Sequence, residues 1–166
     1  MRRLVVLLCA LATVIPVHAV SAQPHSSERA HTLVSSPAKQ IATIVIGKLK
    51  LSAPVFMGVT EAIFDRGVGQ WPGTPSPGKN GNLVLGGHRT SGNAPFVNIQ
   101  LLKSGDIISI TANKKTFKYK VTGHSIVKPS AVWITKQTST PTLTLFSCHP
   151  IGKVTHRYVV RAVLIA

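Results

Sequence analysis

Strict alternation of apolar and polar residues in short segments is the feature that most constrains how this chain folds. Between residues 116 and 122, Phe117, Tyr119 and Val121 are separated by single lysines. Successive side chains of a β-strand point to opposite faces, so this pattern places one face in a core and the other in water. The segment therefore predicts a strand at the surface of a β-structure.

Gly and Pro residues divide the rest of the chain into further short segments. The part between residues 67 and 81 is too rich in Gly and Pro for regular structure, and it ends at Asn80-Gly81, a pair typical of tight turns. A helical turn is expected at 96–102. Many short strands separated by Gly and Pro predict an all-β domain, folded as a closed barrel or a sandwich. The predicted strands cover residues 44–51, 54–57, 107–111, 116–122, 143–148 and 158–165, and one more begins at Asn82.

The N-terminus has the layout of a secretory signal. Arg2 and Arg3 precede an apolar run, which is followed by small residues up to Ala22. If the segment is retained, residues 4–22 come close to the roughly 20 residues that span a bilayer, with the two arginines on the cytoplasmic side. We expect a cleaved signal or a membrane anchor over 1–22, a solvated extracellular tether over 23–40 and one domain over 41–166. Either outcome places the domain outside the cell, on the membrane or secreted.

The charge of the chain is strongly basic. Lys and Arg number 19 against 4 Asp and Glu, which favours anionic partners such as wall polymers or lipid headgroups. Nucleic-acid binding would need basic residues interleaved with stacking aromatics on one face. Here the lysines are scattered and aromatic residues make up 5% of the chain, so we expect no nucleic-acid partner.

The scarcity of carboxylates excludes several kinds of chemistry. The chain has too few carboxylates for a two-carboxylate glycosidase or for a calcium site. A Ser-His-Asp triad lacks both a convincing acid partner and a G-x-S-x-G turn. The spacing of His and Cys residues matches no zinc motif. We therefore expect neither a metal nor another cofactor. The four carboxylates are Glu28, Glu61, Asp65 and Asp106.

Cys148 is the best candidate for a reactive group. If the N-terminal segment is cleaved, Cys9 leaves with it, and Cys148 then has no partner for an internal disulfide. A catalytic thiol needs an imidazole nearby, and acyl transfer needs a cation or N–H donors at the developing oxyanion. Cys148 ends a predicted strand and Arg157 begins the next, so a hairpin would bring the guanidinium beside the sulfur. His88 ends another strand, directly after two glycines.

At these residues the chain resembles the sortases, the cell-wall transpeptidases of Gram-positive bacteria. The resemblance covers residues 41–164, and it is most similar to the actinobacterial housekeeping type called class E. Where the family usually has threonine before the cysteine, this chain has Ser147. The motifs that carry the resemblance are Thr144-Leu145-Phe146-Ser147-Cys148, His149-Pro150, Arg157, Gly87-His88-Arg89-Thr90 and Ala94-Pro95-Phe96.

The resemblance implies a closed sortase β-barrel with short helical turns and a two-step reaction. Cys148 would attack the Thr–Gly carbonyl of a C-terminal LPxTG or LAxTG sorting motif on a surface protein, and an amine of the peptidoglycan precursor would resolve the thioacyl enzyme. His88 would pair with the thiol and protonate the leaving amine, while Arg157 would hold the substrate and the oxyanion. Thr144, Leu145 and Ser147 are expected to contact substrate. The family also implies a membrane anchor, and we expect a monomer.

Two other functions stay open on the sequence alone. An L,D-transpeptidase-like enzyme would also use a cysteine on wall peptide, but a glycine precedes the cysteine in such enzymes, and Ser147 stands there in this chain. A basic module that binds anionic wall polymers would have Cys148 merely packed, with an unreactive thiol.

Overall fold

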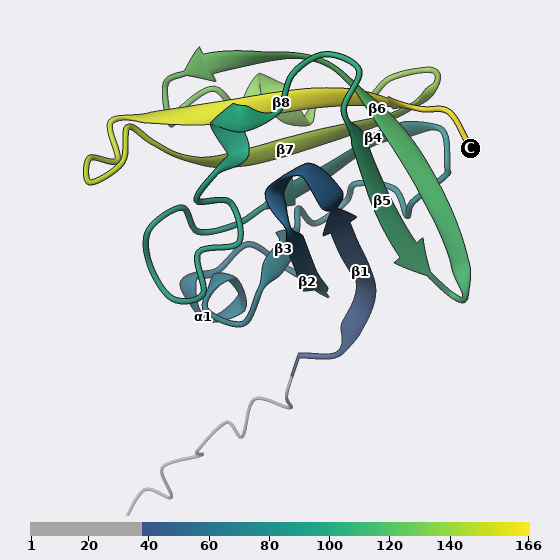
Figure 1. The fold of residues 1–166 in the computed structure, drawn as a ribbon, viewed down its shortest axis with the longest axis horizontal. Helices are drawn as coiled ribbons and strands as arrows, with labels where there is room; N and C mark the ends of the chain where they lie inside the picture. Colours follow the sequence, from purple (N-terminus) through teal and green to yellow (C-terminus); the bar gives the residue numbers. More distant parts are fainter. Residues whose placement is uncertain (1–37) are drawn as a thin grey trace, which may run out of the picture. The chain divides into compact units, whose positions relative to one another are not determined.

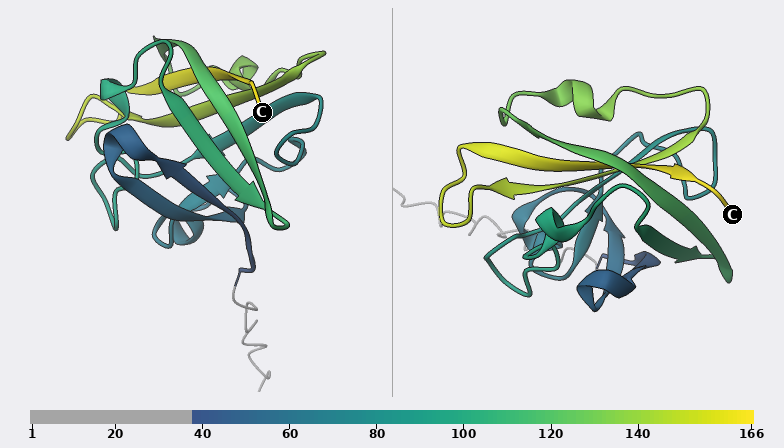
Figure 2. Two further views of the ribbon diagram at one scale, coloured as in Figure 1. Left: turned by 45° about the vertical axis from the view of Figure 1, so that its right-hand side comes forward. Right: turned by 45° about the horizontal axis from the view of Figure 1, so that its top comes forward.

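The computed structural model describes residues 38–166, which form a closed barrel of eight strands. The strands follow the order β1-β2-β3-β4-β7-β8-β6-β5 around the barrel (Figures 1 and 2). This confirms the predicted all-β barrel. The signal or anchor predicted for 1–22 and most of the predicted tether lie outside the described residues. Within 38–166, no helix is long and apolar enough to cross a membrane.

Short helical segments join the strands. The strands are β1 (Gln40–Ile46), β2 (Leu51–Met57), β3 (Val68–Gln70), β4 (Gly81–Gly86), β5 (Ile107–Ala112), β6 (Lys115–Val127), β7 (Pro141–His149) and β8 (His156–Leu164). The helical segments are α1 (Glu61–Phe64) and three 3-10 turns, η1 (Gly47–Leu49), η2 (Ile99–Leu101) and η3 (Val132–Thr135).

The core fills the barrel, as the alternating pattern predicts. Tyr119 and Val121 on β6 are buried, whereas Lys118 and Lys120 are exposed. The hydroxyl of Tyr119 accepts a hydrogen bond of 2.8 Å from the backbone N–H of Gly78. Burial raises the pKa of this phenol above its usual value. The hydrogen bond also holds the long loop after β3 against the barrel.

The sequence prediction of one strand over 44–51 is wrong. The chain turns at η1, and Ile46 of β1 lies opposite Leu51 of β2 in an antiparallel hairpin. Lys50 adopts a left-handed conformation with φ 50°, which reverses the chain direction. The alternation of Lys and Leu arises here because the turn exposes its lysines and leaves Leu49 packed on the core.

The Gly-rich stretch that predicted no regular structure contains β3. This strand pairs in parallel with β2 and antiparallel with β4, and so completes the barrel. A Cβ atom at Gly69 would collide with the carbonyl oxygen of Gly58, so glycine is needed for close packing rather than for a turn. The pattern of glycines predicts a loop, but the backbone of this segment pairs with β2 and β4 as a strand.

Candidate active site

Strands β4 and β7 lie side by side and run in parallel, so the segments that follow them lie at the same end of the barrel. Gly86 pairs with Phe146, and the N–H of Gly87 donates to the carbonyl of Phe146 over 3.2 Å. The hydroxyl of Ser147 donates to the carbonyl of Gly87 over 2.9 Å. The backbone that carries His88 is thereby fixed to the strand that carries Cys148.

Arg157 lies directly opposite Cys148 in the antiparallel pair of β7 and β8. Its guanidinium donates to the backbone carbonyls of His156 over 3.1 Å and Val154 over 3.5 Å. It has no ion-pair partner within the part of the chain that the structure describes. The charge is thus available for an oxygen atom of a bound molecule.

Cys148, His88 and Arg157 line one cavity of about 290 Å³. Ser147 lines it too. Cys148 is a free, partly exposed cysteine, and the imidazole of His88 is largely buried. The structure therefore brings together the three residues for which the sequence predicted catalytic roles, at the open edge of the barrel.

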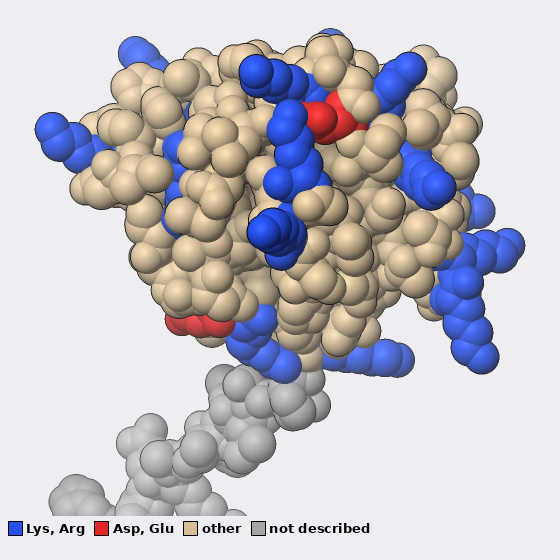
Figure 3. All heavy atoms as spheres, in the orientation of Figure 1, with Lys and Arg blue, Asp and Glu red and all other residues tan. Residues whose placement is uncertain are grey.

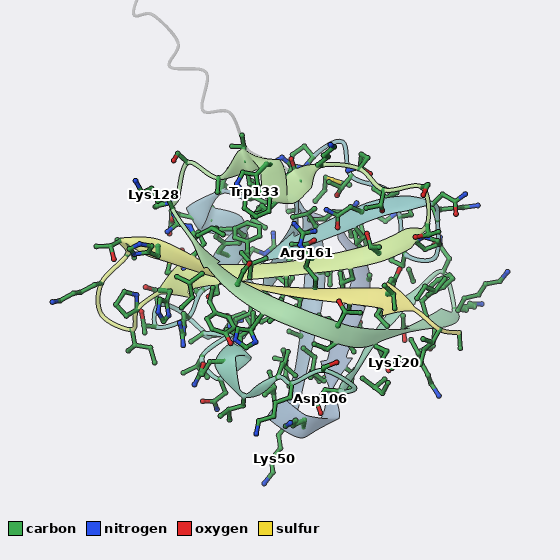
Figure 4. All side chains as sticks on the ribbon, turned by 90° about the horizontal axis from the view of Figure 1, so that it is seen from above. Lys50, Asp106, Lys120, Lys128, Trp133 and Arg161 are labelled. Atoms are coloured by element: carbon green, nitrogen blue, oxygen red, sulfur yellow. The ribbon has the colours of Figure 1, made fainter. Side chains whose placement is uncertain are left out.

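Aromatic side chains form one wall of this cavity. The rings of Trp71 and Phe146 meet edge to face at 5.9 Å, and Phe64 meets Phe146 in the same way at 6.4 Å. Trp133, by contrast, lies outside the cavity with 56% of its surface exposed, and Arg161 stacks over its ring at 5.7 Å (Figure 4). The cavity offers a ligand both apolar walls and the polar groups of Cys148, His88 and Arg157.

Thr144 and Leu145, predicted to contact substrate, do not line the cavity. Leu145 is fully buried in the barrel core. The hydroxyl of Thr144 donates to the side-chain oxygen of Asn82 over 2.8 Å and is within 3.3 Å of the guanidinium of Arg161. The two side chains thus point to opposite faces of β7, Leu145 into the core and Thr144 toward Asn82 and Arg161, and their contact with substrate stays a prediction.

Arg89 is a buried cation behind the strand of Cys148, and the sequence assigned it no separate role. Its guanidinium donates to the carbonyl of Cys148 over 3.2 Å and to the side chain of Gln100 over 2.8 Å. Nδ1 of His149 lies 2.8 Å away, and burial lowers the pKa of His149, which favours the neutral imidazole that accepts this bond. Burial also lowers the pKa of Arg89. Arg89 therefore anchors the end of β7.

We predict that Arg89→Ala destabilises the domain by about 3 kcal/mol, because the carbonyl of Cys148 and the amide of Gln100 lose a charged donor. For a domain of this size, Tm should fall by about 10 °C. Thermal unfolding followed by circular dichroism measures the change. Arg66→Ala is the control, because Arg66 is an exposed arginine that stacks on Phe56. Equal values of Tm for the two variants would contradict an anchoring role for Arg89.

Two carboxylates lie beside His88, a contact to which the sequence assigned no role. Oδ1 of Asp65 lies 3.1 Å from Nε2 of His88, and Oε2 of Glu61 lies 3.5 Å from the same nitrogen. Sequence reasoning missed them because α1 has four residues, too few for a helical period to appear. The available signal was their spacing of four residues, which places both on one side of a helical turn.

No metal site is indicated by the side chains of residues 38–166. Groups of three or more His, Cys, Asp or Glu side chains that could hold an ion do not occur there. The chemistry available at the cavity is that of a thiol, an imidazole with two nearby carboxylates, and a guanidinium.

Comparison with known proteins finds one family. The sortase domain matches residues 44–165. Sortase D of Bacillus subtilis (strain 168) is 29% identical over 119 residues, which cover 69% of this chain and 59% of that protein. Sortase A of Bacillus anthracis is 32% identical over 144 residues, which cover 86% of this chain and 68% of that protein. The chain thus spans about three fifths to two thirds of the length of these curated relatives.

Solved structures give the same result. A lid mutant of sortase A from Corynebacterium diphtheriae superposes with a TM-score of 0.74 at 29% identity, covering 80% of this chain and 73% of that one. A sortase D5 transpeptidase from Clostridium perfringens superposes with a TM-score of 0.71 at 32% identity, covering 77% and 80%. The similarity extends over the barrel that carries the cavity.

Proposed function

The chain belongs to the sortase family, and on this premise we propose that it is a cysteine transpeptidase that joins surface proteins to the cell wall. The observation that supports this most is the cavity shared by Cys148, His88 and Arg157. A thiol, an acid–base group and a cation are what acyl transfer requires. Ser147 and Gly87 keep the segments of Cys148 and His88 together.

The first step cleaves the bond between Thr and Gly of a C-terminal sorting motif. The thiolate of Cys148 attacks the threonine carbonyl carbon, and the guanidinium of Arg157 donates to the developing oxyanion. The carbon–nitrogen bond then breaks, and the imidazolium of His88 gives its proton to the leaving glycine amine. A thioester on Cys148 and a peptide with a free amine result.

The second step transfers the acyl group to an amine of the peptidoglycan precursor. This amine attacks the thioester carbon and gives a proton to His88, while Cys148 leaves as thiolate. An amide replaces the thioester, and the enzyme returns to its starting state. Water is the competing nucleophile, so the yield of transfer depends on how well the amine occupies the site.

The sorting motif is of the LAxTG or LPxTG type. The segments Gly87-His88-Arg89-Thr90 and Cys148-His149-Pro150 are similar to class E and favour LAxTG as one candidate. The aromatic wall formed by Trp71 and Phe146 suits an apolar side chain in the motif. The N-terminal segment would hold the enzyme at the outer face of the membrane, where its substrates are exported.

Mass spectrometry of the purified chain with LAxTG and LPxTG peptides tests this function. We expect an acyl adduct on the proteolytic fragment that contains Cys148, and its loss with formation of a new amide when an amine is added. The relative rates rank the two motifs. An absent adduct on a readily alkylated thiol would favour another acyl donor, such as wall peptide. An unreactive thiol would favour a binding module instead.

A further inference from the structure

We propose that Asp65 is a positioning residue for His88, and that it determines which ring nitrogen of the imidazole carries the proton. The role rests on the proposed function, since a positioned imidazole matters only if His88 acts as acid and base. Asp65 does not touch the thiol or the substrate in this scheme. It acts through the ring of His88.

The contact of Asp65 with His88 has the geometry of a hydrogen bond. Nε2 and Oδ1 are 3.1 Å apart. A carboxylate only accepts hydrogen bonds, so in neutral His88 the proton must lie on Nε2. Nδ1 then becomes the basic nitrogen, and it makes no hydrogen bond with other residues of the range 38–166. In this arrangement Nδ1 is the nitrogen left to exchange protons with the thiol and the amine.

The ring of His88 is held from two more sides. Phe64, directly before Asp65, meets it edge to face at 5.6 Å. Gly92 adopts a left-handed φ of 55° in the loop after β4, and a Cβ there would lie 3.3 Å from Oδ1 of Asp65 and 3.6 Å from Cδ2 of His88. The loop therefore passes close to both groups, while 61% of the Asp65 side chain stays exposed. These contacts fix the plane of the ring, and Asp65 fixes its tautomer.

Two carboxylates, Glu61 and Asp65, lie beside His88, which is unusual in a chain with so few acidic residues. Lys and Arg spread over the face drawn in Figure 3, where acidic side chains cover only small areas. Of the carboxylates in residues 38–166, Asp106 pairs with Lys48 at 2.7 Å, whereas Glu61 and Asp65 approach the ring of His88 and no Lys or Arg side chain of that range within 4.0 Å. Asp65 is the C-cap of α1, and its carboxylate lies against the ring of His88.

Asp65→Asn and Glu61→Gln form a matched pair that separates the effect of the hydrogen bond to His88 from the effect of a nearby negative charge. Each substitution removes one negative charge near Nε2, but only Asp65 has the hydrogen bond. We expect Asp65→Asn to lower kcat for peptide transfer about tenfold, a part of the 10²- to 10⁴-fold that a positioned acid–base group contributes. The KM for the peptide should change less than about twofold, because substrate does not touch Asp65. Glu61→Gln should lower kcat less than Asp65→Asn does, because Glu61 lines the cavity but makes no hydrogen bond with the ring of His88.

Nitrogen NMR of the His88 ring gives a readout that needs no activity. In the parent chain and in Glu61→Gln, the neutral ring should carry its proton on Nε2; in Asp65→Asn a substantial fraction should move to Nδ1. An unchanged tautomer in Asp65→Asn, or equal losses of kcat in both variants, would overturn the proposal. If the parent chain forms no acyl adduct, the proposed transpeptidase function fails, while the NMR result still decides whether Asp65 sets the tautomer of His88.

Discussion

Replacement of Cys148 by alanine is expected to reduce peptide cleavage and transfer by roughly 10⁶-fold, to the limit of detection. Loss of a catalytic nucleophile costs about this much in enzymes that act through a covalent intermediate. The hydroxyl of the neighbouring Ser147 cannot replace the thiol, because it is buried and donates to the carbonyl of Gly87. Release of the glycine-terminated fragment, followed by chromatography and mass spectrometry, measures the loss.

Cys9→Ala is the control for this substitution, because Cys9 is the other cysteine of the chain. It should retain full activity and the acyl adduct. Cys148→Ala should unfold at the same temperature as the parent chain within a few degrees, since its side chain is only partly buried. Cleavage by a folded Cys148→Ala above about one hundredth of the parent rate would exclude Cys148 as the nucleophile.

The proximity of Cys148 and Arg157 could be predicted from the sequence, because a hairpin between two consecutive strands places residues at this spacing opposite each other. Both residues lie at strand ends joined by a short loop, and antiparallel pairing places them opposite each other. Alternation likewise predicted the first half of β6, where the two faces differ in burial, although β6 continues to Val127, five residues beyond the predicted end. Strands β7 and β8 were predicted from their apolar residues instead, and each has consecutive buried residues on both faces. The closed barrel follows from many such strands. These parts of the fold depend on local patterns and short connections.

Other parts depend on contacts between segments that are distant in the sequence. The anchoring role of Arg89 requires β4 and β7 to run in parallel, which no local pattern in either strand predicts. The approach of Asp65 to His88 requires α1 and the end of β4 to meet, 23 residues apart. The strand β3 was missed because the same glycines that permit its close packing are typical of loops. The sequence therefore predicted the proposed catalytic groups better than the residues that surround them.

Replacement of Arg157 by alanine is expected to lower kcat/KM for the sorting peptide by about 10³-fold. Removal of one donor to an oxyanion costs about 10²- to 10³-fold in kcat, and loss of substrate holding raises KM in addition. The guanidinium of Arg157 makes hydrogen bonds only with nearby backbone carbonyls within the described range, so its loss should leave the fold intact. Steady-state kinetics with the preferred peptide measures both constants.

Arg161→Ala is the matched control, because Arg161 lies four residues further along the same face of β8. Its guanidinium stacks on Trp133 (Figure 4) and donates to Thr144, and Arg161 is not among the residues that line the cavity with Arg157. Its replacement should change kcat/KM less than about fivefold. Arg157→Lys should recover only part of the activity, because an ammonium supplies charge without the planar fork of a guanidinium. Equal losses for Arg157→Ala and Arg161→Ala would contradict a direct role for Arg157, since Arg157 lies opposite Cys148 and lines the cavity, whereas Arg161 does not.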